Sequence, residues 1–280
     1  MDSIAFIKMH GLGNDFVIID GRKTPINLTA ETARQIADRR LGVGCDQLIL
    51  LDKPRNPDAR TFMTIYNADG GTSAACGNAT RCVAALLMSE SDSDEAVIET
   101  DAGMLIGTGD ANGVTVDMGT PGLKWNDIPL NNKADTLHLD LSVGDTVSDP
   151  AACSMGNPHA TFFVDDIDAI DIAAIGPGLE HHKMFPKRAN IGFAQVLNRT
   201  QLRLRVWERG AGLTPACATG SCATVVNGVR RKLLDRRVEC VLDGGTLTVT
   251  WREEDDHVLM TGPVSVSFTG LLNPTLVEGL

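Results

Sequence analysis

Two cysteines, Cys76 and Cys217, stand at matching places in the 280-residue chain, each directly before a segment with helical periodicity. Apolar side chains recur with the period of a helix over residues 79–87 after the first cysteine, and over residues 222–229 after the second. A helix N-terminus has free backbone N–H groups and about half a positive charge, so it can bind a carboxylate and lower the pKa of a thiol from about 8.5. Both thiols are therefore candidates for chemistry beside a carboxylate.

Two thiols on opposite sides of one ligand suit a particular reaction. If one thiolate removes a proton from a carbon next to a carboxylate, and the other thiol returns a proton to the opposite face, the configuration of that carbon is inverted. The helix N-termini would stabilise the negative charge that grows on the carboxylate. A single cysteine at a helix start is usually a small buried hydrophobe, but a matched pair favours function over packing. We therefore expect proton transfer at an acidic carbon.

Two other thiol chemistries remain open at this point. Zinc sites prefer Cys-x-x-Cys pairs with further ligands, whereas Cys76 is followed by Cys82 and Cys217 by Cys222, so we expect no metal. A cysteine nucleophile with His159 as its base is possible, but it leaves the second cysteine without a role. The remaining cysteines are expected to be free thiols in the core, because an odd set spread over a long chain is unlike a secreted disulfide framework; they are Cys45, Cys82, Cys153, Cys222 and Cys240.

An internal repeat places the two cysteines in equivalent surroundings, because several features recur in the same order at an offset of 141 to 143 residues. An amphipathic helix is predicted over residues 30–41, with Thr29 as N-cap and Gly42 as C′, and it matches residues 171–182. The other matched pairs are Gly13-Asn14 with Gly156-Asn157, residues 64–67 with 205–208, residues 75–82 with 216–222, and residues 118–121 with 260–263. Two homologous halves follow from this order.

The repeat predicts an α+β protein of two homologous, pseudo-symmetric domains, since strands dominate and no regular βαβ alternation is visible. We expect an N-terminal domain over residues 1–118, which carries Cys76, and a C-terminal domain over residues 119–262, which carries Cys217. The alternating residues 264–268 belong to a C-terminal segment, 263–280, that is either an extra edge strand or a strand returning to the N-terminal domain.

Composition excludes several classes of partner. Lys and Arg number 25 against 36 Asp and Glu, for a formal charge of −11, and no basic stripe for nucleic acid is present. Apolar runs are far shorter than the roughly 20 residues of a membrane span, so we expect no membrane association. The first residues lack a basic region followed by an apolar core, which predicts a cytoplasmic protein.

The motifs of this chain also resemble those of the diaminopimelate epimerases, cofactor-independent enzymes that convert LL-2,6-diaminopimelate to the meso form. The resemblance runs along nearly the whole chain, and it is carried by Lys8–Phe16, Gly42–Leu48, Tyr66–Gly70, Cys76–Asn78, Gly156–His159, Glu208–Gly210 and Ala216–Cys217. It implies an isomerase of lysine and cell-wall precursor biosynthesis that uses neither cofactor nor metal and acts as a homodimer. It also implies that each domain is a curled, mostly antiparallel sheet around a central helix, with the active site in the cleft between the domains.

The resemblance further implies roles for individual residues. Cys76 and Cys217 would be the acid–base thiols, with His159 and Glu208 tuning them. Backbone and side-chain donors for the reacting carboxylate would come from Gly77, Asn78, Ala218 and Thr219. The ammonium groups and the unreactive end would be held by Asn14, Gln47, Asn67, Asn157, Asn190, Glu208 and Arg209. Arg209 can clamp a carboxylate through two hydrogen bonds, and a second carboxylate distinguishes diaminopimelate from smaller amino acids.

Departures from the family pattern and competing functions bear on the substrate. Gly71, Ala79 and Ala218 replace Ser, Gly and Gly of the usual pattern, and the methyl group at 218 lies where it could crowd a carboxylate. The main alternative is a proline or hydroxyproline racemase-epimerase of the same fold, which typically carries His after the first Cys-Gly, where this chain has Asn78. A binding domain without activity, or a relative that works without the thiols, would be expected to lack one of the two cysteines.

Overall fold

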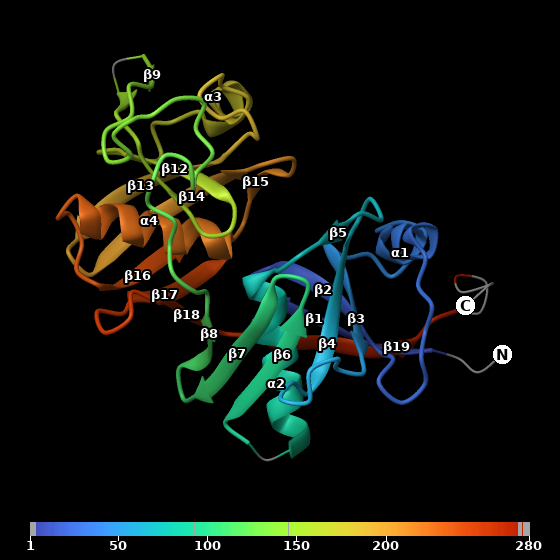
Figure 1. Cartoon of the computed structure of the whole chain (residues 1–280). Coiled ribbons are helices and arrows are strands. Elements are labelled where there is room, and N and C mark those ends of the chain that lie inside the picture. The colour runs from blue at the N-terminus through green and yellow to red at the C-terminus, as the bar shows by residue number, and fades with distance from the viewer. Residues whose placement is uncertain (1–3, 92, 145, 274–275, 277–280) are drawn as a thin grey trace. The chain divides into compact units, whose positions relative to one another are not determined.

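Helices and strands alternate irregularly along the chain, which confirms the predicted α+β class (Figure 1). The structure is a computed structural model and describes residues 4–91, 93–144, 146–273 and 276. Contacts between residues divide the chain into two compact units, unit 1 from Met1–Val116 with Gly262–Leu280 and unit 2 from Asp117–Thr261. None of the helices within the described residues is long and apolar enough to cross a membrane.

Unit 1 is a mostly antiparallel sheet with two helices. Strand β1 pairs with β2 on one side and, on the other, with the strand β19 from the end of the chain. The parallel pair β2 and β3 is joined through α1, whereas α2 is followed by β6, which lies parallel to β4. Its elements are β1 (Ala5–Gly11), β2 (Asn14–Asp20), α1 (Ala30–Ala37), β3 (Gln47–Asp52), β4 (Thr61–Asn67), β5 (Thr72–Ser73), α2 (Gly77–Ser91), β6 (Glu95–Thr100), β7 (Gly103–Asp110), β8 (Gly113–Asp117) and β19 (Ser265–Leu271).

The core of unit 1 forms where α2 packs against the sheet. Helix α2 contacts β1, β6 and β7, and Figure 1 shows it beside β6. Its side chains Val83 and Leu87 are buried in one cluster with Phe16 and Ile49 of the sheet. Because α2 is buried along much of its length, its first turn is held firmly in place.

Unit 2 repeats the element order of unit 1 and adds a small two-stranded sheet before it. The added strands are β9 (Ser142–Val143) and β10 (Val147–Ser148). The repeated elements are β11 (Ala151–Ser154), β12 (Pro158–Phe163), α3 (Ile172–Glu180), β13 (Asn190–Asn198), β14 (Gln201–Glu208), β15 (Gly212–Thr214), α4 (Ala218–Arg230), β16 (Arg237–Leu242), β17 (Gly245–Trp251) and β18 (Val258–Gly262).

The repeat extends to the pairing register of the strands. In unit 1, β2 runs parallel to β3 with Phe16 opposite Gln47, and in unit 2, β12 runs parallel to β13 with His159 opposite Asn190. Each residue of the second pair follows its counterpart by 143 positions, the offset that the Gly-Asn motifs have in the sequence. The prediction of two homologous domains is therefore confirmed at the level of individual residue pairs.

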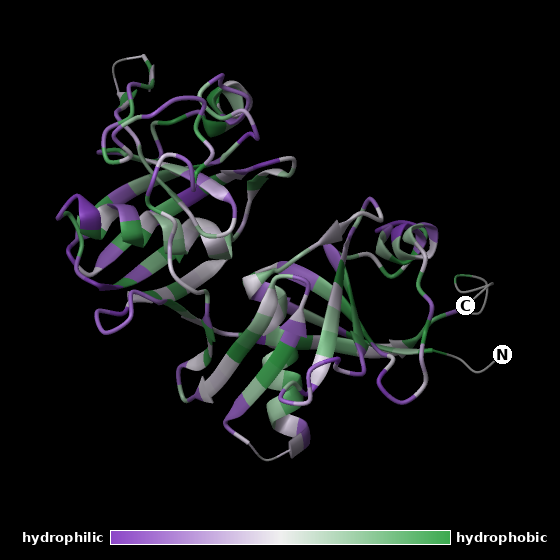
Figure 2. Cartoon of the chain, viewed as in Figure 1, coloured by the Kyte–Doolittle hydropathy of each residue, from purple (hydrophilic) through white to green (hydrophobic). Residues whose placement is uncertain are grey.

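The first helix of each half begins as predicted but is shorter than expected. Thr29 caps α1, because its side chain accepts a hydrogen bond from Thr32 N at 3.1 Å, and Asp171 caps α3 in the same way. The prediction that α1 reaches Leu41 with Gly42 as C′ is wrong, since the helix ends at Ala37. The carboxylate of Asp38 accepts hydrogen bonds from the backbone N–H groups of Arg40 and Leu41 and turns the chain out of the helix. Figure 2 shows both hydrophilic and hydrophobic residues on α1, as expected for a helix with one buried face.

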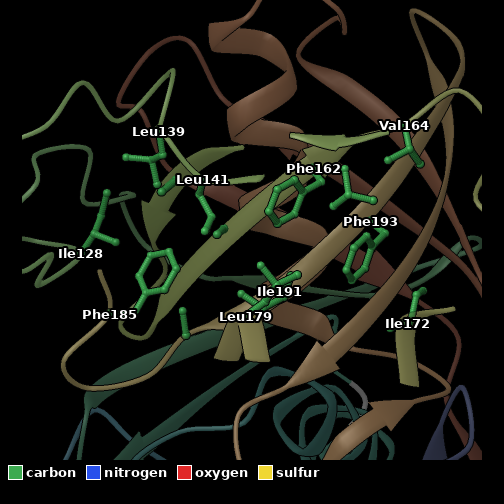
Figure 3. Close-up of a cluster of buried hydrophobic side chains, with 14 of the residues drawn as sticks. Ile128, Leu139, Leu141, Phe162, Val164, Ile172, Leu179, Phe185, Ile191 and Phe193 are labelled. Carbon is green, nitrogen blue, oxygen red and sulfur yellow. The ribbon is translucent and has the colours of Figure 1, made fainter. Parts of the chain in front are cut away.

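A separate hydrophobic core holds unit 2 together (Figure 3). Phe162 on β12 and Phe193 on β13 stack with their ring centroids 5.7 Å apart. Leu139 and Leu141, from the segment that precedes β11, are buried in the same cluster. The added segment thus covers one part of the sheet that carries the second half of the repeat.

We expect Phe193→Ala to destabilise unit 2 by about 3–5 kcal/mol, because the ring is fully buried and its removal leaves a cavity. All three tryptophans of the chain lie in unit 2, at positions 125, 207 and 251, so urea unfolding followed by their fluorescence reports on this unit. Leu197→Ala on the same strand is the control, since Leu197 is 47% exposed. Equal losses in the two variants would show that β13 does not carry the core as described.

Candidate functional site

Both predicted cysteines lie at the starts of helices, as the spacing indicated. Cys76 immediately precedes α2, and its carbonyl oxygen accepts hydrogen bonds from Thr80 N at 2.9 Å and Thr80 Oγ1 at 2.8 Å. Cys217 is the N-cap of α4, and its carbonyl oxygen accepts from Ser221 N and Ser221 Oγ, both at 3.0 Å. The first helical turn therefore has the same hydrogen-bond geometry after both cysteines. Cys76 is partly exposed, whereas Cys217 is buried.

The thiol of Cys217 is held in a protonated state by its surroundings. Burial raises the pKa of Cys217 well above the ordinary value, and the charge and hydrogen bond of Glu208 act in the same direction. Hydrogen bonds from Gly220 N, at 3.4 Å, and from Thr219 lower that pKa but are outweighed. The expectation that a helix start lowers the thiol pKa is therefore wrong for Cys217, because burial and a neighbouring carboxylate exceed the effect of the helix.

Gly220 makes the contact between the thiol and the helix possible. A Cβ atom at this position would lie 3.1 Å from Cys217 Sγ and 2.9 Å from a methyl carbon of Val206. Any larger residue would therefore push the sulfur away from the N–H group or displace β14. The small residue belongs to the thiol site.

Unit 2 brings most of its predicted site residues into one hydrogen-bonded group. Asn157 Oδ1 lies 2.9 Å from His159 Nε2, and Asn157 Nδ2 donates to Thr219 Oγ1 at 3.4 Å in the first turn of α4. Asn190 Nδ2 donates to the carbonyl oxygen of Pro158 at 3.1 Å and lies 3.5 Å from His159 Nε2. Asn157, His159 and Asn190 thus form one linked group, which reaches the first turn of α4 through Asn157.

His159 is neutral in this group. Burial lowers its pKa to about 3, and the positive charge of Arg209 acts in the same direction. Because the Oδ1 atom of Asn157 can only accept, the hydrogen between the two side chains is on His159 Nε2. His159 Nδ1 is then left as an acceptor.

The turn between β14 and β15 carries Glu208 and Arg209. The Oε1 atom of Glu208 accepts a hydrogen bond from Thr214 Oγ1, and the backbone N–H of Arg209 donates to Asn190 Oδ1 at 2.9 Å. The exposed guanidinium of Arg209 donates to the carbonyl oxygen of Lys187 at 3.1 Å. Among the residues that the structure describes, no carboxylate forms an ion pair with Arg209, so its charge is available to a ligand.

In unit 1 the predicted binding residues form two amide pairs. Asn78, at the start of α2, donates through Nδ2 to Asn14 Oδ1 at 3.0 Å, and Gln47 donates through Nε2 to Asn67 Oδ1 at 2.9 Å. Asn14 in turn donates to Asp46 Oδ2 at 2.9 Å. The remaining amide oxygens, Asn78 Oδ1 and Gln47 Oε1, are buried and meet no hydrogen-bond donor in the described part of the chain. One N–H group of each amide is used within unit 1, and the unpartnered oxygens are the acceptors that these two residues offer a ligand.

Gly77 and Ala218 occupy the first positions of α2 and α4, and both are buried. The first N–H groups of a helix have no partner within it, so these residues offer backbone donors beside each cysteine. The methyl group of Ala218 leaves its N–H in place.

The five other cysteines are buried, as expected for core residues. Burial raises the pKa of Cys82 and of Cys153 to about 12, which makes both poor nucleophiles at neutral pH. Within the described residues, no group of three His, Cys, Asp or Glu side chains is arranged to hold a metal ion.

Glu180, at the end of α3, was not predicted from the sequence. Glu180 is 3% exposed, and its carboxylate accepts hydrogen bonds from Trp207 Nε1 at 2.8 Å, Gly210 N at 3.0 Å and Arg188 Nη1 at 3.2 Å. Trp207 and Gly210 flank the two charged residues of the β14–β15 turn, so Glu180 holds that turn in place. No pattern marks it, because a glutamate at a helix end is usually solvated.

Comparison with known proteins identifies relatives along nearly the whole chain. The family model described as "Diaminopimelate epimerase" matches residues 6–124 and 151–267. The diaminopimelate epimerase of Acidiphilium cryptum is 56% identical over 275 residues, which cover 97% of each chain. That of Rhodospirillum centenum is 54% identical and covers 98% of this chain and 94% of its own.

Solved structures with the same fold are much less similar in sequence. A protein of the phenazine biosynthesis PhzF family from Bacillus anthracis has a TM-score of 0.70 at 18% identity, over 98% of this chain and 100% of its own. A hydroxyproline epimerase from Agrobacterium vitis has a TM-score of 0.68 at 16% identity, over 96% and 92%. These likenesses establish the fold.

We expect Glu208→Gln to speed the alkylation of Cys217, because removing the carboxylate's charge lowers the pKa of the thiol. The rate at pH 8 should rise roughly tenfold for each unit by which that pKa falls. Iodoacetamide labelling from pH 7 to 10, followed by peptide mass spectrometry, measures the rate. Cys153 is the internal control, since burial is the main cause of its raised pKa and Glu208 has no part in it. An unchanged or slower reaction at Cys217 would contradict the role assigned to Glu208.

Proposed function

The chain belongs to the diaminopimelate epimerase family, and we propose that it inverts one α-carbon of LL-2,6-diaminopimelate to give the meso form, in lysine and cell-wall precursor biosynthesis. It is an isomerase. The main structural support for the proposal is the matched pair of helix starts, each with a cysteine and with backbone N–H groups that have no partner within the helix.

Cys76 and Cys217 are proposed as the two acid–base groups. One acts as a thiolate and takes the α-proton, and the electron pair left on carbon is delocalised into the carboxylate. The other, as a thiol, gives its proton to the opposite face of the carbon and becomes a thiolate. Cys217, which burial and Glu208 keep protonated, suits the role of the thiol in one direction of the reaction. The scheme requires that the two sulfur atoms face opposite sides of one α-carbon.

The charge that develops in this reaction falls on the carboxylate next to the reacting carbon. We assign its stabilisation to the backbone N–H groups of Gly77, Asn78, Ala218 and Thr219. His159 is neutral, so it can adjust a neighbouring thiol by hydrogen bonding without adding a positive charge.

The remaining polar residues are proposed to recognise the rest of the substrate. Arg209 clamps the distal carboxylate, which is supported by its exposed guanidinium and by the lack of an ion-pair partner among the described residues. Asn14, Gln47, Asn67, Asn157, Asn190 and Glu208 are assigned to the ammonium groups and the unreactive end. The buried acceptors on Gln47 and Asn78 suit an ammonium ion, which has donors only.

A proline or hydroxyproline racemase-epimerase is the alternative function within this fold. The hydroxyproline epimerase from Agrobacterium vitis is only 16% identical to this chain, whereas the diaminopimelate epimerases compared above are more than 50% identical. Asn78 and Arg209 also suit a substrate with a second carboxylate better than a single ring.

Incubation with LL-diaminopimelate in deuterated water should wash deuterium into one α-carbon, because the returning proton comes from a thiol that exchanges with solvent. NMR and mass spectrometry follow the exchange, and chiral chromatography follows the meso product. We expect Cys76→Ala and Cys217→Ala each to reduce net epimerisation by at least about 10³-fold.

Cys153→Ala is the control variant, since this thiol is buried in the core and has no proposed part in the reaction. Deuterium exchange into L-proline, with none into diaminopimelate, would reject the proposed substrate in favour of proline. Net epimerisation that persists in either catalytic-cysteine variant would reject the two-thiol scheme.

A cytoplasmic homodimer is also proposed. Buried thiols that form no disulfide, such as those of Cys45, Cys153 and Cys240, suit a reducing compartment. The strand β19 exposes Val266, Phe268 and Leu271, which are 58%, 50% and 65% exposed. A second copy of the chain would remove these apolar side chains from water.

We therefore expect the purified chain to elute as a dimer in size-exclusion chromatography with light scattering, and Val266→Asp to shift it toward monomer, because the charge would be buried in the interface. Leu197→Asp, at a position 47% exposed on β13, should leave the dimer intact. A monomeric unchanged chain would contradict the assembly without affecting the proposed reaction.

A further inference from the structure

The side chain of Asn78 leaves one buried acceptor without a partner. Asn78 is 3% exposed, at the start of α2 and two residues after Cys76. Its Nδ2 donates to Asn14 Oδ1 at 3.0 Å, and its Oδ1 meets no donor among the residues that the structure describes. A buried acceptor is costly unless it is satisfied, so a donor from a ligand is expected at this atom.

The orientation of Asn78 depends on a chain of amides that ends at a carboxylate. An amide side chain can be turned so that its oxygen and nitrogen change places, and its shape alone does not decide between the two orientations. Asn14 Nδ2 lies 2.9 Å from Asp46 Oδ2, and an ionised carboxylate can only accept. Asn14 must therefore direct its NH2 group to Asp46 and its oxygen to Asn78. Asn78 must in turn direct its NH2 group to Asn14, so the Oδ1 atom of Asn78 is left for a ligand.

Asp46 is held in position by a charged network. Arg39 donates to Asp46 Oδ1 at 2.7 Å and also to both carboxylate oxygens of Asp15, at 2.7 and 3.0 Å. The backbone N–H groups of Asp15 and Asp46 each donate to the other residue's carboxylate, at 3.1 and 2.9 Å. Lys8, which is buried, forms an ion pair with Asp15 at 2.6 Å. The carboxylate that orients Asn14 is thus fixed by two strands, β1 and β2, and by the segment that follows α1.

The network also stays charged at neutral pH. Burial would raise the pKa of Asp15, but hydrogen bonds from Arg39 and then Lys8 outweigh it and hold that pKa well below its ordinary value. Asp15 therefore remains an acceptor for the backbone N–H of Asp46 throughout the physiological range.

We propose that Asp46 is a positioning residue that sets the hydrogen-bond direction of Asn14 and Asn78, so that Asn78 Oδ1 accepts a hydrogen bond from a substrate ammonium group. The inference rests on the proposed function. The backbone N–H groups at the start of α2 take the carboxylate, and the side chain of Asn78 takes an ammonium rather than adding another donor. A ligand with a carboxylate and an ammonium group on one carbon can bind the backbone N–H groups and Asn78 Oδ1 at the same time.

The comparison of Asp46→Asn with Asp46→Glu tests the proposal. Asn has the shape of Asp but can turn its NH2 group toward Asn14, which lets both amides reverse and presents the NH2 group of Asn78 to the ammonium. Glu is longer but can only accept. We expect Asp46→Asn to raise KM for LL-diaminopimelate by roughly 10- to 100-fold with a smaller change in kcat, and Asp46→Glu to remain within about threefold of the unchanged chain. If Asp46 acted only through packing, the longer Glu side chain would raise KM more than the isosteric Asn side chain.

Asp168→Asn is the matched control, because Asp168 is also an exposed carboxylate paired with an arginine, at 2.7 and 2.9 Å, and lies far along the chain from the amides. The pH profile of kcat should be the same in all four proteins, since no catalytic group is altered. In ¹⁵N–¹H spectra of the free protein, the side-chain amide signals of Asn14 and Asn78 should move in Asp46→Asn and stay in place in Asp168→Asn.

Equal KM values in Asp46→Asn and Asp168→Asn would overturn the proposal, as would unmoved amide signals. A shifted pH profile would also overturn it, because Asp46 would then act through its charge on the thiols. If the unchanged chain does not epimerise diaminopimelate, the proposed function fails, and the amide signals still report on the hydrogen-bond direction.

Discussion

The site depends on backbone N–H groups that two helices leave without partners at their first turns. A helix cannot satisfy its first four N–H groups internally, and in this chain a cysteine stands directly before them in each half of the repeat. The positive end of each helix favours negative charge on a carboxylate or on a sulfur. The rest of each unit serves to hold that helix start still. Helix α2 is buried against a sheet, and the first turn of α4 is linked to Asn157 by one hydrogen bond, from Asn157 Nδ2 to Thr219 Oγ1.

Local surroundings decide how each thiol responds to its helix. At Cys217 the helix would favour the thiolate, but burial and Glu208 oppose it and prevail. The partly exposed Cys76 does not experience the same burial. Two helix starts with almost the same backbone geometry thus hold their sulfur atoms in different environments. Such a difference favours the state with one thiol and one thiolate that the proposed reaction needs.

The sequence alone was sufficient for the features that follow from periodicity and spacing. These include the two cysteine-led helices, the N-cap Thr29, and the duplication of the fold. The early end of α1 was not predicted, because it results from competition between the side chain of Asp38 and the helix for backbone N–H groups.

Contacts between distant residues were also beyond prediction. Asp46 reaches Asn14 across 32 positions and Asn14 reaches Asn78 across 64, and no local pattern encodes either contact. The raised pKa of Cys217 depends on burial, and Glu180 is important only because the fold removes it from water. Periodicity indicates which face of a helix or strand is buried, but it does not indicate which polar group from a distant part of the chain will contact that face.

The duplicated register has a consequence for the division of labour between the halves. Asn67 and Glu208 end equivalent strands, β4 and β14, yet one is a neutral amide paired with Gln47 and the other is an acid beside a thiol. Inversion of a single carbon needs one acid–base group on each of its two faces, and a duplicated scaffold supplies one such group from each half. Telling one end of an elongated molecule from the other is a one-sided task, and a perfectly symmetric protein could not perform it. In the proposed reaction, divergence at such paired positions lets the duplicated scaffold bind the two ends of its ligand differently.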